Sequence, residues 1–343
     1  MATIKDVAKL AGVSSSTVSK YLNNPEAMKA ENYLLVENAV KKLNYTPNLL
    51  ARSLRVNSSR TIAVIAQEIT NPFHATLYNI IRKEAQKSGY SVVLYSASDI
   101  DGNLDDIFGP VPISYFSGVI IAYLTDILQS YDFAISNINV PSVVLSNDLG
   151  VSKAYPSVTS VYLDIKAGII QAVEHLISLG MRKIAFLGST TNPPELEPKL
   201  SAFLDTLEKH NLKPCHIINS KQDYTAASGY HSVENLLRMK SLPDAIVVAS
   251  DIMTLGAMRC LADYGLSIPE DMLLVSCDDT ILSSMASPAW TSVCLPVEDA
   301  SSKACELLIG QIKKQPVEGQ VVSFNTNLIV RETTKLVQRI TDN

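Results

Sequence analysis

The sequence predicts a small all-α helix-turn-helix head joined to an α/β core that contains two doubly wound parallel sheets. A helix, a glycine turn and a second helix open the chain, and from Thr61 onward apolar runs alternate with amphipathic helical segments. Residues 1–60 hold nine Lys and Arg against four Asp and Glu, a net of +5, within a chain of net −5. The rest of the chain therefore carries −10, and a basic head on an acidic body is typical of a head that meets polyanionic DNA.

The first two helices have clear start and stop signals. Thr3 has the side chain of an N-cap, Asp6 stands three positions later, and Gly12 ends the first helix. Ser14 has the side chain of an N-cap for the second helix. Each helix has one apolar stripe, formed by Ile4, Val7, Ala8 and Ala11 in the first helix and by Val18, Tyr21 and Leu22 in the second.

A third helix completes the head, which we expect to span residues 1–46. Its apolar positions recur with helical spacing at Val36, Ala39, Val40 and Leu43. The second helix exposes small or cationic hydrogen-bonding side chains, as a helix that meets base edges and phosphates would: Ser15, Ser16, Thr17, Ser19 and Lys20. The same residues are also compatible with a polar surface helix of a small bundle.

Residues 47–60 form a predicted hinge helix and linker. Residues 48–56 favour a helix but are too few to be stable alone in water, so a partner must order them. Leu54 could wedge between base steps in the minor groove while Arg52 and Arg55 meet the backbone. An ordinary interdomain linker with a few leucines is the alternative.

The core from Thr61 alternates predicted strands with predicted helices. Buried strands are expected at 62–66, 91–96, 118–122, 141–146, 183–188, 245–250 and 272–277, and helices at 73–88, 166–179, 198–211, 225–239 and 253–264. This alternation predicts parallel sheets with right-handed crossovers. Two such sheets side by side form a cleft at the carboxyl ends of their strands, which is the favoured ligand site of open α/β folds.

Several functional classes are not supported by the sequence. The five cysteines are scattered and the histidines are not spaced as a metal cluster, so we expect reduced thiols and no metal site. Motifs of nucleotide-binding loops, serine hydrolases and zinc proteases are missing, so we expect no cofactor and no enzyme. No apolar run reaches a membrane span and no signal peptide is recognised, so we expect a cytoplasmic protein without a membrane partner.

Three ordered motifs near the N-terminus closely resemble the LacI/GalR family of bacterial repressors. They are TIKDVAKLAGVSSSTVSKYLNN at 3–24, LNYTPN at 43–48 and ARSL at 51–54. The resemblance implies that Ser15, Ser16 and Lys20 read the major groove and that Leu54 is the minor-groove wedge. The complete set of predicted DNA contacts is Thr3, Ser14, Ser15, Ser16, Thr17, Ser19, Lys20, Asn23, Ala51, Leu54 and Arg55.

The same resemblance continues to about Thr334 and implies a core like that of periplasmic sugar-binding proteins. Its motifs include NPF at 71–73, AVEHLISLG at 172–180, SDIMTLGAM at 250–258, VSCDD at 275–279 and LIVRETT at 328–334. In this family three segments cross between two lobes, and we place the crossings near 160, 291 and 322. Lobe 1 would then comprise about 61–160 and 292–321, lobe 2 about 161–291 and 322–334, followed by a tail at 335–343.

The resemblance also implies an effector pocket between the lobes. Asp278 matches an aspartate that binds ligand hydroxyls, although an aspartate that caps a loop is the alternative. Asn71 matches the pocket edge, although Pro72 alone could explain it as a helix start. Lys199, Ser250 and Asn147 stand where many members have other residues, which predicts a chemically distinct pocket. The predicted effector contacts are Asn71, Phe73, Asn147, Lys199, Tyr224, Ser250 and Asp278.

These features predict a homodimeric regulator that binds double-stranded operator DNA and represses carbohydrate-use genes under control of a small sugar-like effector. The nine residues after Thr334 are too few for a tetramerising coiled coil, which favours a dimer. Gly109-Pro110-Val111-Pro112 interrupts a segment that is usually helical near the family's dimer interface. Two alternatives are a catabolite-control regulator with a phosphoprotein corepressor and, in a different class, a solute-binding transport protein.

Overall fold

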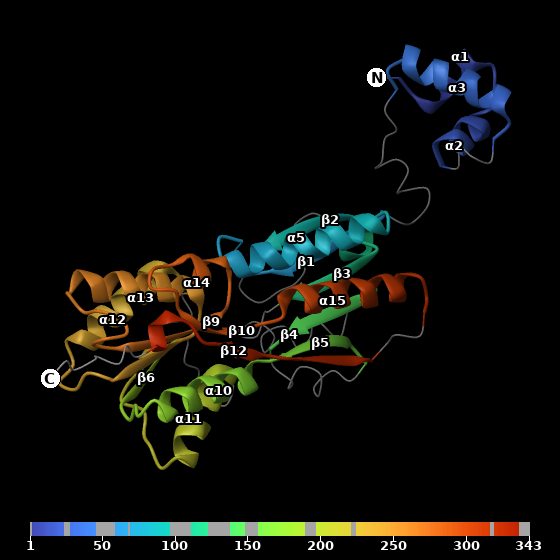
Figure 1. Ribbon diagram of the computed structural model, residues 1–343. Helices are drawn as coiled ribbons and strands as arrows, with labels where there is room; N and C mark the ends of the chain where they lie inside the picture. The colour runs from blue at the N-terminus through green and yellow to red at the C-terminus, as the bar shows by residue number, and fades with distance from the viewer. Residues whose placement is uncertain are drawn as a thin grey trace. The chain divides into compact units, whose positions relative to one another are not determined.

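The computed structural model describes residues 2–23, 28–45, 59–67, 69–96, 111–122, 138–147, 157–188, 197–220, 224–315 and 319–335. Met1–Arg60 and Thr61–Asn343 form two compact units (Figure 1). The predicted hinge, including Ala51, Leu54 and Arg55, lies outside the described residues except for its last two positions, and so do Gly109 and Pro110.

The head consists of three helices, α1 (Ile4–Ala11), α2 (Ser15–Asn23) and α3 (Ala30–Lys42). Thr3 and Asp6 form the predicted capping box at α1, and Gly12 adopts the left-handed conformation at its end with φ of 67°. The hydroxyl of Ser14 accepts a hydrogen bond from the Thr17 N–H at 3.1 Å, as predicted for the start of α2. The helices share an apolar core whose fully packed members are Val7, Ala8, Ala11, Val18, Val36 and Ala39.

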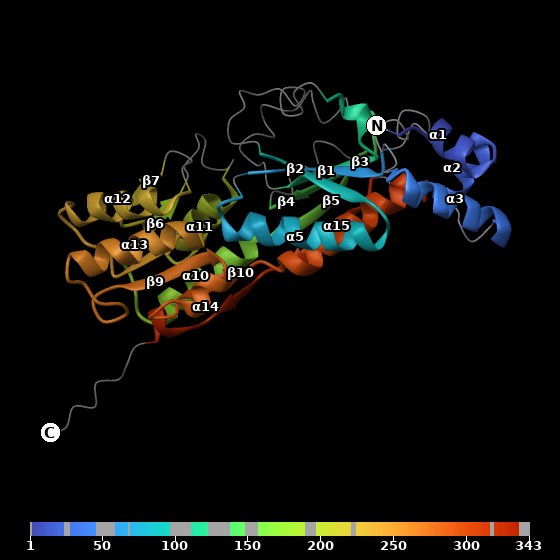
Figure 2. The same ribbon diagram turned by 90° about the horizontal axis from the view of Figure 1, so that it is seen from above.

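Lobe 1 of the core is built on a six-stranded sheet in the order β11-β5-β4-β3-β1-β2, in which every pair is parallel. Its strands are β1 (Thr61–Ala66), β2 (Ser91–Ser96), β3 (Gly118–Ala122), β4 (Ser142–Ser146), β5 (Thr159–Asp164) and β11 (Val321–Asn325). Helices α5 (Pro72–Lys87) and α15 (Val297–Ile312) lie side by side on it, as both ribbon views show (Figures 1 and 2). A short 3₁₀ turn, Ile113–Tyr115, precedes β3.

Lobe 2 contains a second six-stranded sheet in the order β12-β10-β9-β8-β6-β7. Its strands are β6 (Ile184–Gly188), β7 (Ile217–Asn219), β8 (Ala245–Val248), β9 (Leu273–Asp278), β10 (Thr291–Cys294) and β12 (Asn327–Ile329). Its helices are α10 (Ile165–Ser178), α11 (Pro198–Lys209), α12 (Ala226–Leu237), α13 (Asp251–Asp263) and α14 (Ile281–Met285), and a 3₁₀ turn follows at Glu332–Thr334. The edge strand β12 pairs antiparallel with β10, so this sheet is mixed where the sequence predicted a parallel one.

The predicted lobe boundaries were a few residues early. The chain leaves the first sheet after Asp164, leaves the second sheet after Cys294, and passes from the first sheet to the second at Thr326. Consequently β10 belongs to lobe 2 and β11 to lobe 1, the reverse of the predicted assignment. The reason is that each strand stays paired in its own sheet to its last residue before the chain crosses. The Thr326 hydroxyl ties two of the crossings together by donating to the Asp164 carbonyl at 2.6 Å.

The prediction of a buried strand at 91–96 was wrong in one respect. The strand forms, but it is the edge of its sheet and its residues are half-buried or exposed, with Val93 41% exposed. Composition alone does not separate an edge strand from a central one, because valine and tyrosine suit both. The other predicted strands of the core lie inside their sheets and are almost completely buried.

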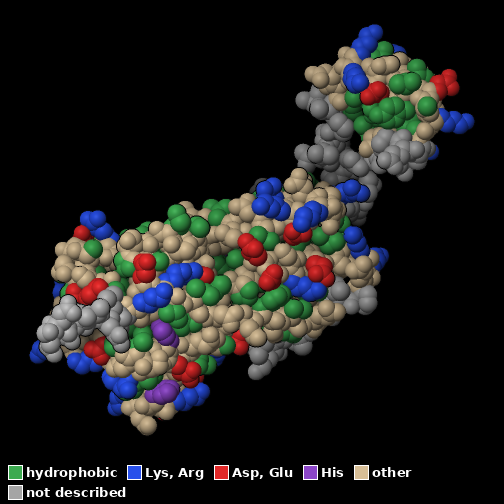
Figure 3. Space-filling model, viewed as in Figure 1, with side chains coloured by type: hydrophobic (Ala, Val, Ile, Leu, Met, Phe, Trp, Pro, Cys, Tyr) green, Lys and Arg blue, Asp and Glu red, His purple; other side chains and the backbone are tan. Residues whose placement is uncertain are grey.

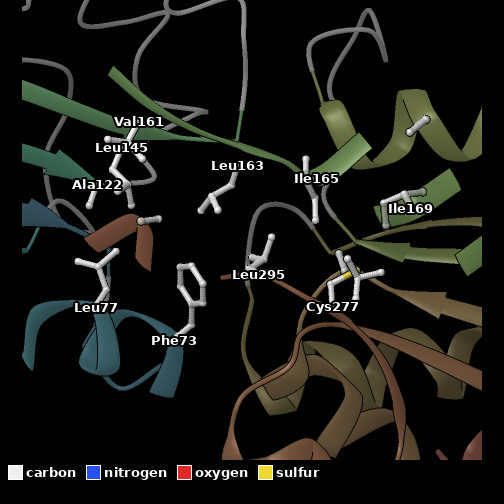
Figure 4. Close-up of a cluster of buried hydrophobic side chains, with 14 of the residues drawn as sticks. Phe73, Leu77, Ala122, Leu145, Val161, Leu163, Ile165, Ile169, Cys277 and Leu295 are labelled. Carbon is white, nitrogen blue, oxygen red and sulfur yellow. The ribbon is translucent and has the colours of Figure 1, made fainter. Parts of the chain in front are cut away.

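One apolar cluster extends through both lobes. Figure 4 shows Leu163 and Ile165 on either side of one crossing and Leu295 on another. They lie between side chains of lobe 1 such as Phe73 and side chains of lobe 2 such as Cys277. All five cysteines are free thiols, as predicted. In the described part of the chain, no helix is both long enough and apolar enough to cross a bilayer. Acidic and basic side chains are interspersed over the face of the core in Figure 3, which is typical of a solvated surface.

Helices α12 and α13 approach each other unusually closely. A Cβ atom added to Gly256 of α13 would collide with the carbonyl oxygen of Ala226 in α12, and one added to Gly229 of α12 would collide with the carbonyl of Met253 in α13. The two glycines therefore let the helix backbones touch. This contact fixes the N-terminal ends of both helices, which lie beside the pocket described next.

Candidate functional site

A pocket lies in the core and is lined from both lobes. The seven residues predicted as effector contacts all line it, so the structure brings together positions that are more than 200 residues apart in the chain. Their presence around one cavity is a matter of geometry, and their role in binding is a proposal. The full lining is Gln67, Asn71, Phe73, His74, Asn147, Glu197, Lys199, Tyr224, Ser250, Asp278 and Leu295.

Three helices begin at the wall of this cavity, and in each the N-cap side chain is a lining residue. Asn71 accepts a hydrogen bond from the Phe73 N–H at 3.0 Å at the start of α5. Glu197 accepts from the Lys199 N–H at 3.2 Å in α11, and Ser250 accepts from the Met253 N–H at 3.4 Å in α13. The helix-start explanation of Asn71 is therefore correct, and the residue lines the pocket as well. Helix N-termini carry partial positive charge, which stabilises nearby carboxylates.

Asp278 stands at the end of β9 in an unusual backbone conformation. Its φ is 99° and that of Asp279 is 55°, so two successive residues with side chains occupy the left-handed region. The side chain is almost buried, and burial raises the pKa of the Asp278 carboxyl, whereas Lys199 and a backbone hydrogen bond from Asp251 lower it. A loop aspartate with few exposed atoms and a cation opposite is suited to accept hydrogen bonds from a ligand.

Lys199 is the cation of the described pocket lining. Its Nζ donates to the Ala249 carbonyl oxygen at 2.6 Å, lies 4.0 Å from Asp278 Oδ1 and lies 5.7 Å from the centre of the Tyr224 ring. The ammonium group is thus placed by a backbone acceptor, a carboxylate and an aromatic face. The described lining contains the carboxylates of Glu197 and Asp278 and one ammonium group, so it has no surplus positive charge.

Sequence reasoning missed four of the lining residues, namely Gln67, His74, Glu197 and Leu295. His74 is 6% exposed and forms part of the wall. Burial, and secondarily the charge of Lys199, lowers the pKa of His74 to about 4, so its imidazole is neutral at pH 7. One signal was available in the sequence, because His74 directly follows the Asn71-Pro72-Phe73 motif. No such signal marked Glu197.

Several of the residues predicted to read DNA lie on the surface of the head. Ser15, Ser16 and Lys20 are exposed at or near the N-terminal end of α2. The Ser14 hydroxyl lies 2.7 Å from the Ser16 hydroxyl and 2.8 Å from that of Thr17, so these side chains form one hydrogen-bonded group. Thr3 is exposed and its hydroxyl donates to Asp6, and Ser19 is half-buried. Asn23 ends α2.

Comparison with known proteins matches both units. Residues 3–48 match the family described as bacterial regulatory proteins, lacI family, and residues 173–334 match a periplasmic binding protein-like domain. The chain is 30% identical over 338 residues to the probable HTH-type transcriptional repressor ExuR of Bacillus subtilis (strain 168), covering 98% of this chain and 99% of that protein. It is 32% identical over 335 residues to the ribose operon repressor of Halalkalibacterium halodurans, covering 98% of each.

Solved structures agree with these sequence matches. A crystal structure of the lac repressor dimer bound to operator and the anti-inducer ONPF superimposes with a TM-score of 0.82 at 27% identity, covering 98% of this chain and 99% of that one. The resemblance found in the sequence motifs thus extends over the head and both lobes. The chain belongs to the LacI family of bacterial regulatory proteins and is a DNA-binding transcriptional regulator.

Proposed function

We propose that this protein represses carbohydrate-use genes by binding operator DNA as a homodimer, and that a small sugar-like effector in the pocket between the lobes controls this binding. The observation that carries the proposal is the pocket itself. Side chains from both lobes and three helix N-termini converge on one cavity, in a chain whose head is a helix-turn-helix. A ligand that touches both lobes stabilises one arrangement of the lobes over others.

A neutral polyhydroxylated ligand suits the lining. The Asp278 carboxylate can accept two hydroxyl hydrogen bonds, and Asn147 and Gln67 can both donate and accept. Phe73 from lobe 1 and Tyr224 from lobe 2 offer apolar ring surface for the C–H face of a sugar. The name of one relative, the ribose operon repressor, supports the same ligand class.

The head supplies the DNA contacts in this proposal. Ser16 and Lys20 would meet base edges and phosphates in the major groove, with Leu54 as a wedge in the minor groove. The lac repressor dimer binds its operator with two copies of a chain of similar fold, which supports a symmetric dimer on a near-palindromic site. Thr3, Ser14, Asn23, Ala51 and Arg55 complete this predicted surface.

Coupling between the two functions would pass through the crossing segments. Ligand contacts in both lobes change the lobe arrangement, and in a dimer this changes the separation of the two heads and hinges. A phosphoprotein corepressor remains the competing form of control. A mobility-shift titration of operator separates the two, because a sugar acts on the purified protein alone whereas corepression needs the added partner.

The decisive variant is Asp278→Ala. If Asp278 accepts ligand hydroxyls, its loss should cost about 1.5 to 3 kcal/mol of ligand affinity, the range for a hydrogen bond to a charged group. Operator affinity without ligand should be preserved, because the head is untouched. Isothermal calorimetry with a panel of pentoses, hexoses and hexuronates measures ligand affinity, and a mobility-shift assay measures operator affinity. Full ligand affinity in Asp278→Ala would make this aspartate a loop residue only and move the effector site elsewhere.

A further inference from the structure

Beneath the pocket lies a carboxylate that is not part of the lining. Asp251 is the first residue of α13, it is 0% exposed, and its carboxylate accepts four hydrogen bonds. Oδ1 accepts from the Ser276 hydroxyl at 2.6 Å and from the Trp290 indole N–H at 2.9 Å. Oδ2 accepts from the N–H of Thr280 at 2.6 Å and from its hydroxyl at 2.7 Å. Charge-assisted bonds this short are among the strong ones in proteins.

The donors bracket the strained turn that presents Asp278. Ser276 lies two positions before Asp278, and Thr280 directly follows Asp279. A turn with two successive side-chain-bearing residues at positive φ persists only where its surroundings fix it. Asp251 supplies that fixation from α13, and its own backbone N–H also donates to the Asp278 carboxylate.

A second anchor holds the other side of the same turn. Arg331 Nη1 donates to Asp279 Oδ1 at 2.6 Å and to the Trp290 carbonyl oxygen at 3.1 Å. Trp290 therefore contacts Asp251 through its indole and Arg331 through its backbone. The turn is held between two charged residues that lie outside the described pocket lining.

We propose that Asp251 is the positioning residue of the effector site: its four hydrogen bonds hold the turn in the one conformation that places the Asp278 carboxylate in the pocket. The consequence for ligand affinity rests on the proposed function, whereas the consequence for the turn does not. Asparagine at position 251 would keep one acceptor oxygen for Ser276 and Trp290. Its NH₂ group would face the backbone N–H of Thr280, which cannot accept, and donor against donor is repulsive.

The surroundings make this carboxylate sensitive to pH. Burial, followed by the charge of Asp278, raises the pKa of Asp251 to about 6, while the bonds from Ser276 and Thr280 lower it. The titratable and charged groups around this region come from several neighbouring elements. They are Lys199 of α11 and its N-cap Glu197, Cys277 and Asp278 of β9, Asp279 after it, Cys294 of β10, and Arg331. A protonated Asp251 oxygen becomes a donor, so the turn should loosen as the pH falls through about 6.

The test needs no ligand. Trp290 is the sole tryptophan of the chain and is fully buried, so its fluorescence reports on the carboxylate 2.9 Å from its indole nitrogen. Wild-type emission should change with a midpoint near pH 6, and Asp251→Asn should remove that transition. Hydrogen exchange of the Thr280 amide should be roughly tenfold or more faster in the variant at pH 7.5, because its acceptor is lost.

Asp263→Asn is the matched control. It makes the same exchange of side chain at the opposite end of α13, where Asp263 accepts from Tyr230 and Arg259. It should keep both the emission transition and the slow exchange. Thr280→Val removes only the hydroxyl donor. It should change the Trp290 emission transition and the Thr280 amide exchange in the same direction as Asp251→Asn, but by a smaller amount. Thr280→Ser keeps the hydroxyl and should match wild type in both measurements. If Asp251→Asn does not fold, Thr280→Val and Thr280→Ser test the positioning role in its place.

The effect of Asp251 on ligand affinity is tested with D-ribose, whose binding is measured by calorimetry from pH 5 to pH 7.5. Its affinity should fall tenfold or more in Asp251→Asn at pH 7.5 while Asp263→Asn matches wild type. If wild type binds no ribose, ribose is excluded as the effector and the two ligand-free readouts still decide the positioning role. Unchanged Trp290 emission and Thr280 exchange in Asp251→Asn and in Thr280→Val would overturn the inference.

Discussion

Replacing His74 with glutamine should remove a loss of stability that the wild-type protein undergoes in mild acid. His74 is buried in α5 at the pocket wall, with its ring edge-on to Phe73 at a centroid distance of 5.3 Å. Burial, with a smaller contribution from Lys199, lowers its pKa from 6.5 to about 4. Glutamine is neutral and polar, so His74→Gln keeps hydrogen-bonding capacity and removes the titration.

The sign follows from proton binding in the two states. Below pH 6.5 the unfolded chain binds a proton at His74, while the folded protein resists it until about pH 4. Stability is therefore fully present above pH 6.5 and falls as the pH decreases through this window. At pH 5 the loss is about 2 kcal/mol, since each unit of pKa difference is worth about 1.4 kcal/mol and 1.5 units separate pH 5 from the unfolded value.

Asp251 contributes with the opposite sign. Burial is the main cause of its raised pKa in the folded protein, so protonation relieves the cost of a buried charge. The unfolding free energy therefore increases as the pH falls from about 6 to 3.8, while the turn itself loses hydrogen bonds locally. This contribution is common to wild type and His74→Gln and cancels when their pH dependences are compared. The comparison thus isolates the histidine.

Urea unfolding at pH 7.5 and at pH 5 measures the effect. The difference in unfolding free energy between the two pH values should be about 2 kcal/mol smaller in His74→Gln than in wild type. His231→Gln is the control, since it removes an exposed histidine of α12. Parallel pH dependences in wild type and His74→Gln would refute the claim that the folded protein keeps this imidazole neutral.

The sequence predicted most of the fold because its signals are local. The buried strand at 62–66 and the helix closed by Gly180 are marked by runs of apolar residues and by a left-handed glycine within one short segment. The crossings were misplaced because their positions depend on where β10 and β11 stop pairing within their sheets. For β11 the partner is β5, more than 100 residues earlier in the chain. For β10 the partners are β9 and β12, which are separate strands on either side of it in the sequence.

The pocket residues also divide into those marked by local sequence and those that depend on distant segments. Asp278 and Tyr224 were found by motif, and the topology explains why they meet, because parallel strands direct their carboxyl ends to one edge. Glu197 and Asp251 were not found, although both are charged and nearly fully buried. A glutamate before a proline and an aspartate at a helix start look like ordinary capping residues. Their burial comes from segments far along the chain, such as Trp290 for Asp251.

Four further substitutions test the head, the hinge and the packing behind the pocket. Ser16→Ala and Lys20→Ala should change the preference at definable operator positions, whereas Arg55→Ala should weaken all sequences alike, and equal losses for all three in mobility shifts would contradict the groove assignment. Gly256→Ala should lower the free energy of unfolding by roughly 1 to 3 kcal/mol. Alanine is the better helix former, but its Cβ would collide with the Ala226 carbonyl oxygen, and backbone cannot rotate away as a side chain can. Urea unfolding decides between these opposing effects: a midpoint equal to or above that of wild type would mean that α12 can move off α13 at no cost.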